Sequence, residues 1–142
     1  FYFKHKDFNR AGFFFQRAIK FIPGHYAGYY GMGQILAREN KFKQAIYMYK
    51  KAISLNPADA ASYYFLGAAY AKSGNSLAIS AFKQAIKLKP NFARAHNDLA
   101  VAYASMNPPR WKEADKEAKT AKALGYKVTG GLLKLIRKHL GK

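Results

Sequence analysis

Hydrophobic residues recur along the chain at the three- and four-residue spacing of one helical face. Tyr29, Met32 and Leu36, for example, line one face of an α-helix. This spacing, interrupted by Gly, Pro and Asn in short turns, predicts helices at 8–21, 25–38, 42–55, 59–72, 76–88, 93–106, 110–124 and 130–140. We expect residues 1–5 to be the tail of a helix that begins before this sequence. The prediction is an all-α chain without a sheet.

The hydrophobic pattern also repeats over a longer distance. Pro23, Pro57 and Pro90 are spaced by 34 and 33 residues, and each follows a similar segment that begins with Ala-Ile. An alanine and, four residues later, an aromatic residue precede each proline: Ala11 with Phe15, Ala45 with Tyr49, and Ala78 with Phe82. One such repeat cannot bury its apolar face alone, so neighbouring repeats must stack.

This pattern resembles the tetratricopeptide repeat, which places an aromatic residue, Leu-Gly, Tyr, Ala, Phe and Pro over 34 residues. One repeat has Tyr29, Met32-Gly33, Leu36, Ala45, Tyr49, Ala52 and Pro57 in these places, and the next has Tyr63, Leu66-Gly67, Tyr70, Ala78, Phe82, Ala85 and Pro90. His96, Leu99-Ala100, Tyr103, Trp111, Ala114 and Ala121 continue the pattern, and Tyr2, Phe8, Ala11, Phe15, Ala18 and Pro23 precede it as a half repeat.

The resemblance implies a right-handed superhelical solenoid of antiparallel helix pairs, with about 3.5 repeats and a C-terminal capping helix. It predicts one domain over residues 1–142, divided into a partial repeat at 1–24, repeats at 25–58 and 59–92, an atypical repeat at 93–127 and a cap at 128–142. Gly33 and Gly67 lie within predicted helices, where glycine costs about 1 kcal/mol relative to alanine. We expect a close approach of the partner helix to offset this cost.

The chain carries 25 Lys and Arg against 7 Asp and Glu, a formal charge of +18. Such a charge attracts anionic partners, and a merely solvated surface is the alternative. Most basic residues fall on the second helices of the repeats, which the resemblance places on the convex side. They include Lys41, Lys43, Lys50, Lys51, Lys83, Lys87 and Lys89.

Little in the sequence supports catalysis. The four histidines show no metal-ligand spacing, cysteine is absent, and no cofactor is expected. His96 stands in the aromatic place of its repeat, which favours a packing role. Glu113, Asp115 and Glu117 alternate with lysines, as on a solvated helix face. We therefore predict a non-enzymatic scaffold or adaptor.

In the resembled family, the first helices of successive repeats line a concave groove, and residues between the consensus places touch the ligand. Carried onto this chain, the resemblance selects Tyr30, Gln34, Arg38, Tyr64, Phe65, Lys72, Arg94, Asn97 and Asp98. Aromatic and basic residues there suit a protein or peptide partner with apolar and acidic residues. The alternative is that the three aromatic residues only pack between repeats.

Other predictions concern the two ends and the compartment. The basic, amphipathic stretch 132–140 suits a capping helix, with a membrane-surface helix as the alternative. Aromatic residues crowd the half repeat, which suggests self-association there: Phe1, Tyr2, Phe3, Phe8, Phe13 and Phe14. No apolar run approaches the length of a membrane span. The sequence leaves the compartment open, with the cytoplasm favoured, and the main rival function is binding of nucleic acid or acidic lipid by the basic exterior.

Overall fold

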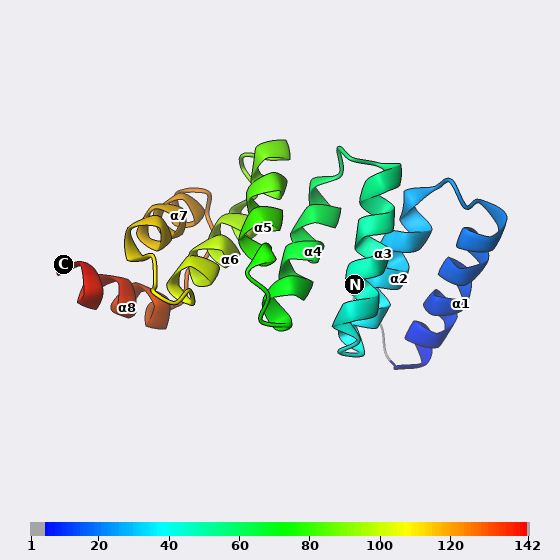
Figure 1. The fold of residues 1–142 in the computed structure, drawn as a ribbon, viewed down its shortest axis with the longest axis horizontal. Helices are drawn as coiled ribbons and strands as arrows, with labels where there is room; N and C mark the ends of the chain where they lie inside the picture. The colour runs from blue at the N-terminus through cyan, green and yellow to red at the C-terminus, as the bar shows by residue number, and fades with distance from the viewer. Residues whose placement is uncertain (1–4, 142) are drawn as a thin grey trace.

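The computed structural model describes residues 5–141, which form α-helices and contain no strand (Figure 1). The helices are α1 (His5–Phe21), α2 (Tyr26–Arg38), α3 (Phe42–Leu55), α4 (Ala60–Lys72), α5 (Leu77–Leu88), α6 (Ala93–Ala104), α7 (Trp111–Ala123) and α8 (Gly130–Leu140). Consecutive helices pack side by side, so α2–α3, α4–α5 and α6–α7 are three helix pairs flanked by α1 and α8. The predicted all-α solenoid is confirmed.

Most helices begin and end within one residue of the predicted positions, with two differences. Helix α1 begins at His5 rather than at residue 8, so His5 does not belong to the tail of an earlier helix. Residues 1–4 lie outside the described part of the chain. Helix α6 ends at Ala104, two residues early. The reason is that Pro108 and Pro109 disfavour a helical conformation just before them and lack an N–H group.

Three turns share one hydrogen-bonding motif. Asn40, Gly74 and Gly125 follow the ends of α2, α4 and α7 and have φ values of 60°, 69° and 90°. The next residue in each turn donates its N–H to a carbonyl five residues earlier, as Asn75 does to Tyr70 at 2.9 Å. This motif satisfies carbonyl groups at the helix end and favours glycine or asparagine at the left-handed position. It stops each helix so that the chain can reverse.

The stack of repeats is curved because helices of adjacent repeats pack more closely on one side than on the other. The first helices of adjacent repeats, α2, α4 and α6, touch one another as well as their neighbours in sequence. The second helices, α3, α5 and α7, make their main contacts only with neighbours in sequence. The first helices therefore lie on the inner, concave side, as the resemblance implied.

Aromatic rings fill the space over the helical glycines. A Cβ atom at Gly33 would lie 2.6 Å from Tyr49 Cε1, and one at Gly67 would lie 2.7 Å from Phe82 Cδ1. The close helix crossing predicted from these glycines is thus confirmed. In the last pair, Ala100 stands in the glycine place and Ala118 in the aromatic place, both at most 1% exposed. A small residue on each helix replaces the glycine and the ring.

Candidate functional site

The aromatic residues predicted for the groove do come together, as part of a longer chain of rings. Phe65 lies between Tyr30 and Tyr64, with ring centroids 5.8 Å and 5.1 Å apart respectively. The Tyr64 ring also contacts that of Phe92, the residue just before α6, with the ring centroids 5.0 Å apart. Such pairs add to stability beyond the area they bury. Packing between repeats, the alternative considered from the sequence, is therefore one role of these residues.

Tyr64 differs from the exposed ligand-binding residue that the sequence suggested. It is only 2% exposed, because Phe65, Phe82 and Phe92 surround its ring. Its hydroxyl donates a hydrogen bond to Oδ2 of Asp98 at 2.5 Å. Burial raises the pKa of Tyr64 well above its usual value, and the hydrogen bond to Asp98 raises it further. The phenol therefore stays neutral and keeps donating to the carboxylate.

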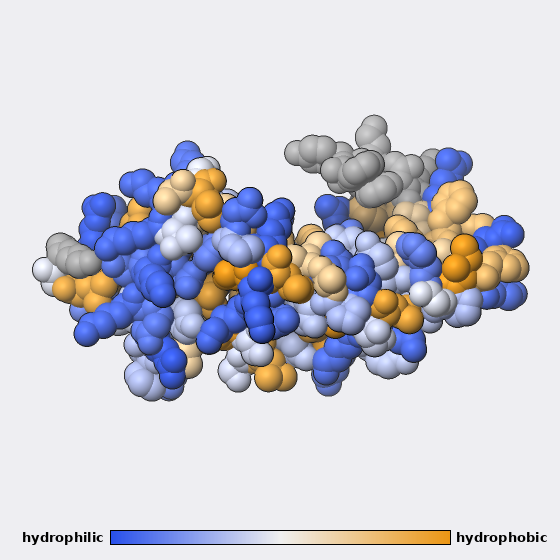
Figure 2. Space-filling model, turned by 90° about the horizontal axis from the view of Figure 1, so that it is seen from above, coloured by the Kyte–Doolittle hydropathy of each residue, from blue (hydrophilic) through white to orange (hydrophobic). Residues whose placement is uncertain are grey.

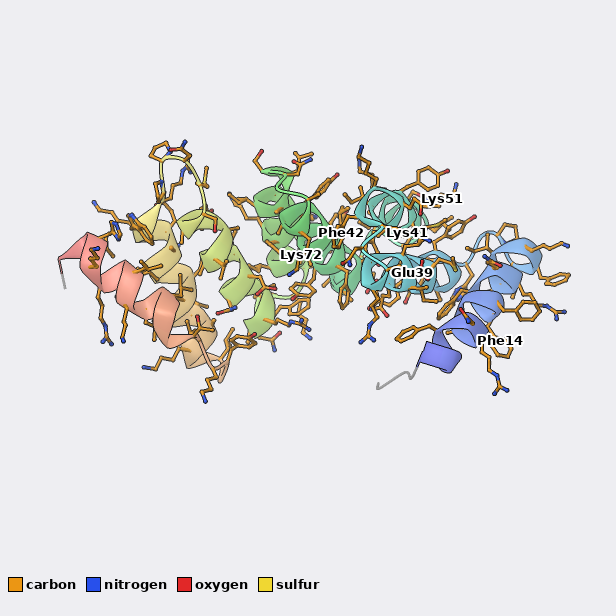
Figure 3. All side chains as sticks on the ribbon, turned by 90° about the horizontal axis from the view of Figure 1, so that it is seen from below. Phe14, Glu39, Lys41, Phe42, Lys51 and Lys72 are labelled. Carbon is orange, nitrogen blue, oxygen red and sulfur yellow. The ribbon has the colours of Figure 1, made fainter. Side chains whose placement is uncertain are left out.

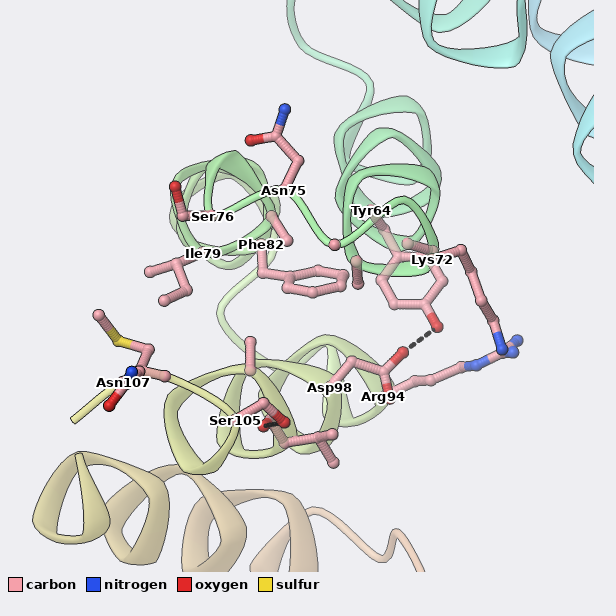
Figure 4. A pocket seen from close by; sticks show the side chains of 17 residues that line it. Tyr64, Lys72, Asn75, Ser76, Ile79, Phe82, Arg94, Asp98, Ser105 and Asn107 are labelled. Atoms are coloured by element: carbon pink, nitrogen blue, oxygen red, sulfur yellow. Dashed lines mark hydrogen bonds between the residues drawn. The ribbon is translucent and has the colours of Figure 1, made fainter. Parts of the chain in front are cut away.

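A pocket of about 750 Å³ opens beside this hydrogen bond, between α4, α5 and α6 (Figure 4). Its floor is apolar, with Ile79 and Phe82 pointing in from α5. Its walls come from α4 and α6, where small residues leave the space open. The residues lining it are Tyr64, Ala68, Ala71, Lys72, Gly74, Asn75, Ser76, Ala78, Ile79, Phe82, Arg94, Asp98, Val101, Ala102, Ser105, Met106 and Asn107.

Two cations border the open side of this pocket. The guanidinium group of Arg94, near the start of α6, lies 5.3 Å from the centroid of the Tyr64 ring. Lys72 is the last residue of α4, eight residues after Tyr64, which corresponds to about 12 Å along a helix. Asp98 is the only acidic residue lining the pocket, and it already accepts the Tyr64 hydrogen bond. The pocket is thus largely apolar, with two positive charges at its border.

The remaining predicted residues lie elsewhere. Tyr30 and Gln34 are half-buried on α2 and share a hydrogen bond of 2.8 Å, in which the Gln34 amide donates to the Tyr30 hydroxyl. Burial, followed by the charge of Asp59 and by Tyr26, raises the pKa of Tyr30 to about 12. Arg38 lies over the ring of Phe8 in α1, at 4.9 Å, and not beside the pocket.

Asn97 is 7% exposed, so it is mainly a buried residue. Its amide donates to Asp98 at 3.1 Å, while its own Oδ1 atom has no hydrogen-bond partner. Among the nine predicted residues, the pocket therefore brings together Tyr64, Lys72, Arg94 and Asp98.

Sequence reasoning missed the contribution of Met106 and Asn107, which close one end of the pocket. They follow α6 in the longer turn before Pro108, outside the repeated pattern, so the period gave no signal for them. Ile79 was missed as well, although it lies one residue after Ala78 in α5. Its position beside a consensus alanine marks it as a residue facing the helix partner.

His96 is buried, as expected from the sequence, but the prediction that Glu117 lies on a solvated helix face is wrong. The Nδ1 atom of His96 lies 2.5 Å from Oε2 of Glu117, and its Nε2 atom lies 2.8 Å from the carbonyl oxygen of Pro90. Both partners are acceptors, so the imidazolium form satisfies both contacts by donating twice. Glu117 therefore reaches into the interface between α6 and α7 and does not lie on a solvated face.

Neither a membrane span nor a metal site is visible in the described residues. None of the helices there has the length and apolar character needed to cross a bilayer. Over the same part of the chain, no group of three or more His, Cys, Asp or Glu side chains lies close enough together to hold a metal ion.

Comparisons with known proteins agree with this architecture. The family model described as "TPR repeat" matches residues 33–74 and 75–107. The chain is similar to the crystal structure of MamA, with 30% identity and a TM-score of 0.76 over 82% of this chain and 68% of that one. It is also similar to MamA 41-end from Desulfovibrio magneticus RS-1, with 27% identity and a TM-score of 0.74 over 84% of this chain and 67% of that one.

A third structure is more distant in sequence. YrrB, described as a TPR protein with an unusual peptide-binding site, is 22% identical, with a TM-score of 0.73 over 84% of this chain and 61% of that one. The chain thus spans 61–68% of the length of these three structures. None of the curated proteins compared with it matches significantly. Stacked helices, family match and structural neighbours agree, and the chain belongs to the tetratricopeptide repeat family of protein-interaction scaffolds.

Proposed function

We propose that the chain binds a short extended peptide segment of a partner protein in the pocket between α4, α5 and α6. The observation that carries this proposal is the combination of an apolar floor with two cations at the border of the pocket. The distance of about 12 Å between Tyr64 and Lys72 along α4 accommodates about four residues of an extended chain. Apolar side chains would fill the floor, and flanking acidic residues would meet Lys72 and Arg94.

Tyr64 and Asp98 form part of the pocket wall, and they bond to each other rather than to a ligand. Their hydrogen bond fixes the wall between α4 and α6, and it leaves the Asp98 carboxylate partly satisfied. Arg94 stays beside them because its guanidinium group lies over the Tyr64 ring. A ligand carboxylate near Arg94 therefore meets a positioned cation.

Synthetic peptides test this proposal directly. Labelled peptides with four apolar residues between two acidic ones should bind at about 0.15 M salt, where exposed charges are well screened. Lys72→Glu with Arg94→Glu should weaken binding at least about tenfold, equivalent to 1.4 kcal/mol. Ala71→Trp should fill the pocket and block binding. Ala71, Lys72 and Arg94 are all exposed, so folding should be unaffected by these substitutions.

The control is Lys134→Glu with Lys138→Glu, which changes the charge equally on α8, away from the pocket. If this control loses binding as strongly as the pocket variant, the attraction is general and the pocket is not the site. Peptides in which the acidic residues are replaced by lysine should bind much more weakly.

The rival function, binding of a polyanion by the basic exterior, has one observation in its favour. Every carboxylate that the structure describes already has a partner: Glu39, Asp59, Asp98, Glu113, Asp115 and Glu117. Much of the positive charge is therefore left without acidic neighbours. Binding of this kind releases counterions and falls steeply with salt. DNA affinity that persists at about 0.15 M salt with sequence preference would favour the rival.

A further inference from the structure

A second pocket adjoins the peptide pocket and shares Ser76, Ile79 and Met106 with it. It has a volume of about 660 Å³ and is formed by α5, the end of α6 and the connection to α7. Its residues are Ser76, Ile79, Ser80, Lys83, Gln84, Lys87, Tyr103, Met106 and Arg110. The splaying of the second helices explains why it exists, since α5 and α7 lack the direct packing that the first helices have.

The charged residues lining this pocket are all cations. Lys83 and Lys87 lie one turn apart on α5, and Arg110 approaches from the residue just before α7. No ion pair joins either lysine to a carboxylate of the described residues. Arg110 has one weak ion pair, with Glu113 at 4.0 Å. Three positive groups from two elements therefore face one space without a neutralising residue in its lining.

Uncharged hydrogen-bond donors complete the lining. Ser80 lies three residues before Lys83, Gln84 lies three residues before Lys87, and Ser76 just precedes α5, seven residues before Lys83. Tyr103 adds a phenol from α6. Burial, followed by the charge of Glu117, raises the pKa of Tyr103, which keeps its hydroxyl protonated. Hydroxyl and amide donors beside ammonium and guanidinium groups match the acceptor oxygens of phosphate.

We infer that this pocket binds a compact small molecule carrying two or more phosphate groups. A long polyanion is a poorer match, because it needs cations spread along a track, whereas these three line one open pocket. The volume lies within the range of small-ligand sites. Lys83, Lys87 and Arg110 do not line the peptide pocket, so this inference does not depend on the proposed peptide function.

Tripolyphosphate is the probe, titrated by calorimetry at about 0.15 M salt. The expected result is saturable binding of one molecule per chain. Lys83→Gln with Lys87→Gln should weaken it at least tenfold, and Arg110→Lys should weaken it less, because it keeps the charge but loses the guanidinium fork. The sole tryptophan, Trp111, is adjacent to Arg110, so its fluorescence should change on binding in the parent chain.

The matched control is Lys134→Gln with Lys138→Gln. These lysines are also exposed and four residues apart, on α8, and they do not line the pocket. Equal losses in the two lysine pairs would overturn the proposal, since the affinity would then reflect general charge. Absence of saturable binding would also overturn it. So would duplex DNA or phosphatidylserine vesicles that bind more tightly than tripolyphosphate and depend more on Lys83 and Lys87.

Discussion

The ring of Phe82 occupies the space where a side chain at Gly67 would begin, because a Cβ atom there would lie 2.7 Å from Phe82 Cδ1. A side chain at position 67 would therefore collide with Phe82 of the partner helix α5. Gly67→Ala should gain helix propensity but strain this contact, for a net loss of about 1 to 2 kcal/mol in the free energy of unfolding. Urea unfolding measures the change.

Two further variants make this prediction specific. In a Phe82→Ala background the added methyl group has room, so Gly67→Ala should become stabilising, and a double-mutant cycle would show the change of sign. Gly12→Ala, in α1, places its Cβ at 3.7 Å from Ile35 Cδ1, an ordinary contact. It should stabilise the chain by about 0.5 to 1 kcal/mol. Equal effects at Gly67 and Gly12 would contradict the close crossing.

Glu117 should be far more important for stability than its neighbours on α7. Glu117→Ala leaves the buried His96 without its carboxylate partner, which should cost about 1 to 3 kcal/mol. Glu113→Ala is the control. The Glu113 side chain is 48% exposed, and its ion pair with Arg110 is weak because the two charged groups are 4.0 Å apart. It should change stability by about 0.5 kcal/mol or less. A small effect at both positions would show that the His96 contact contributes little.

Alkaline pH should destabilise the fold through Tyr30. Its pKa is raised to about 12 by burial, whereas an unfolded tyrosine titrates near 10. Above about pH 10 the unfolded chain releases this proton and the folded chain does not, so stability falls between about pH 10 and 12. Tyr30→Phe should flatten that part of the stability profile, measured by chemical unfolding at a series of pH values. An unchanged profile would exclude Tyr30 as a contributor.

The outer face of α1 is the predicted place of self-association. Phe13, Phe14, Phe21 and Ile22 are 55–68% exposed, and Figure 3 shows Phe14 on the side of α1 away from the other helices. Figure 2 shows apolar surface at this end, while the other end is mainly hydrophilic. Phe14→Glu with Phe21→Glu should reduce association measured by light scattering across a concentration series.

Tyr47 provides the control for that experiment. It is 66% exposed on α3, outside the α1 face, so Tyr47→Glu should leave association unchanged. A parent chain that stays monomeric at all concentrations would refute the prediction. Of the other aromatic residues named for this role, Phe8 is half-buried beneath the guanidinium group of Arg38, and Phe1, Tyr2 and Phe3 lie outside the described residues.

The sequence predicted the fold well, because the residues that set it occur at fixed places in each repeat. Gly33 and Tyr49, or Gly67 and Phe82, meet within one helix pair, so a local pattern carries the information. The end of α6 was less predictable, since it lies in the turn where the period breaks. The site was harder still, because its walls come from α4, α5 and α6 together.

Tyr64 and Arg38 illustrate why the surroundings of the predicted site residues could not be read from the sequence. Tyr64 is buried by Phe82 of α5 and by Phe92, which just precedes α6, and the spacing within α4 does not reveal such contacts. One signal was present, namely that α4 is apolar around most of its circumference, as buried helices are. Arg38 aligns with Lys72 in the repeat, but α1 supplies Phe8 as its neighbour. Position in the repeat therefore predicts the helix face but not the contact.

Each helix in this chain packs mainly against its neighbours in sequence, so a substitution affects few interfaces. The pocket between α4, α5 and α6 is shaped almost wholly by those three helices and the turn that follows them. Substitutions there alter one stretch of surface and leave the other interfaces as they were, since solenoid stability is roughly a sum of local terms. Recognition can thus diverge one helix pair at a time while the framework is conserved.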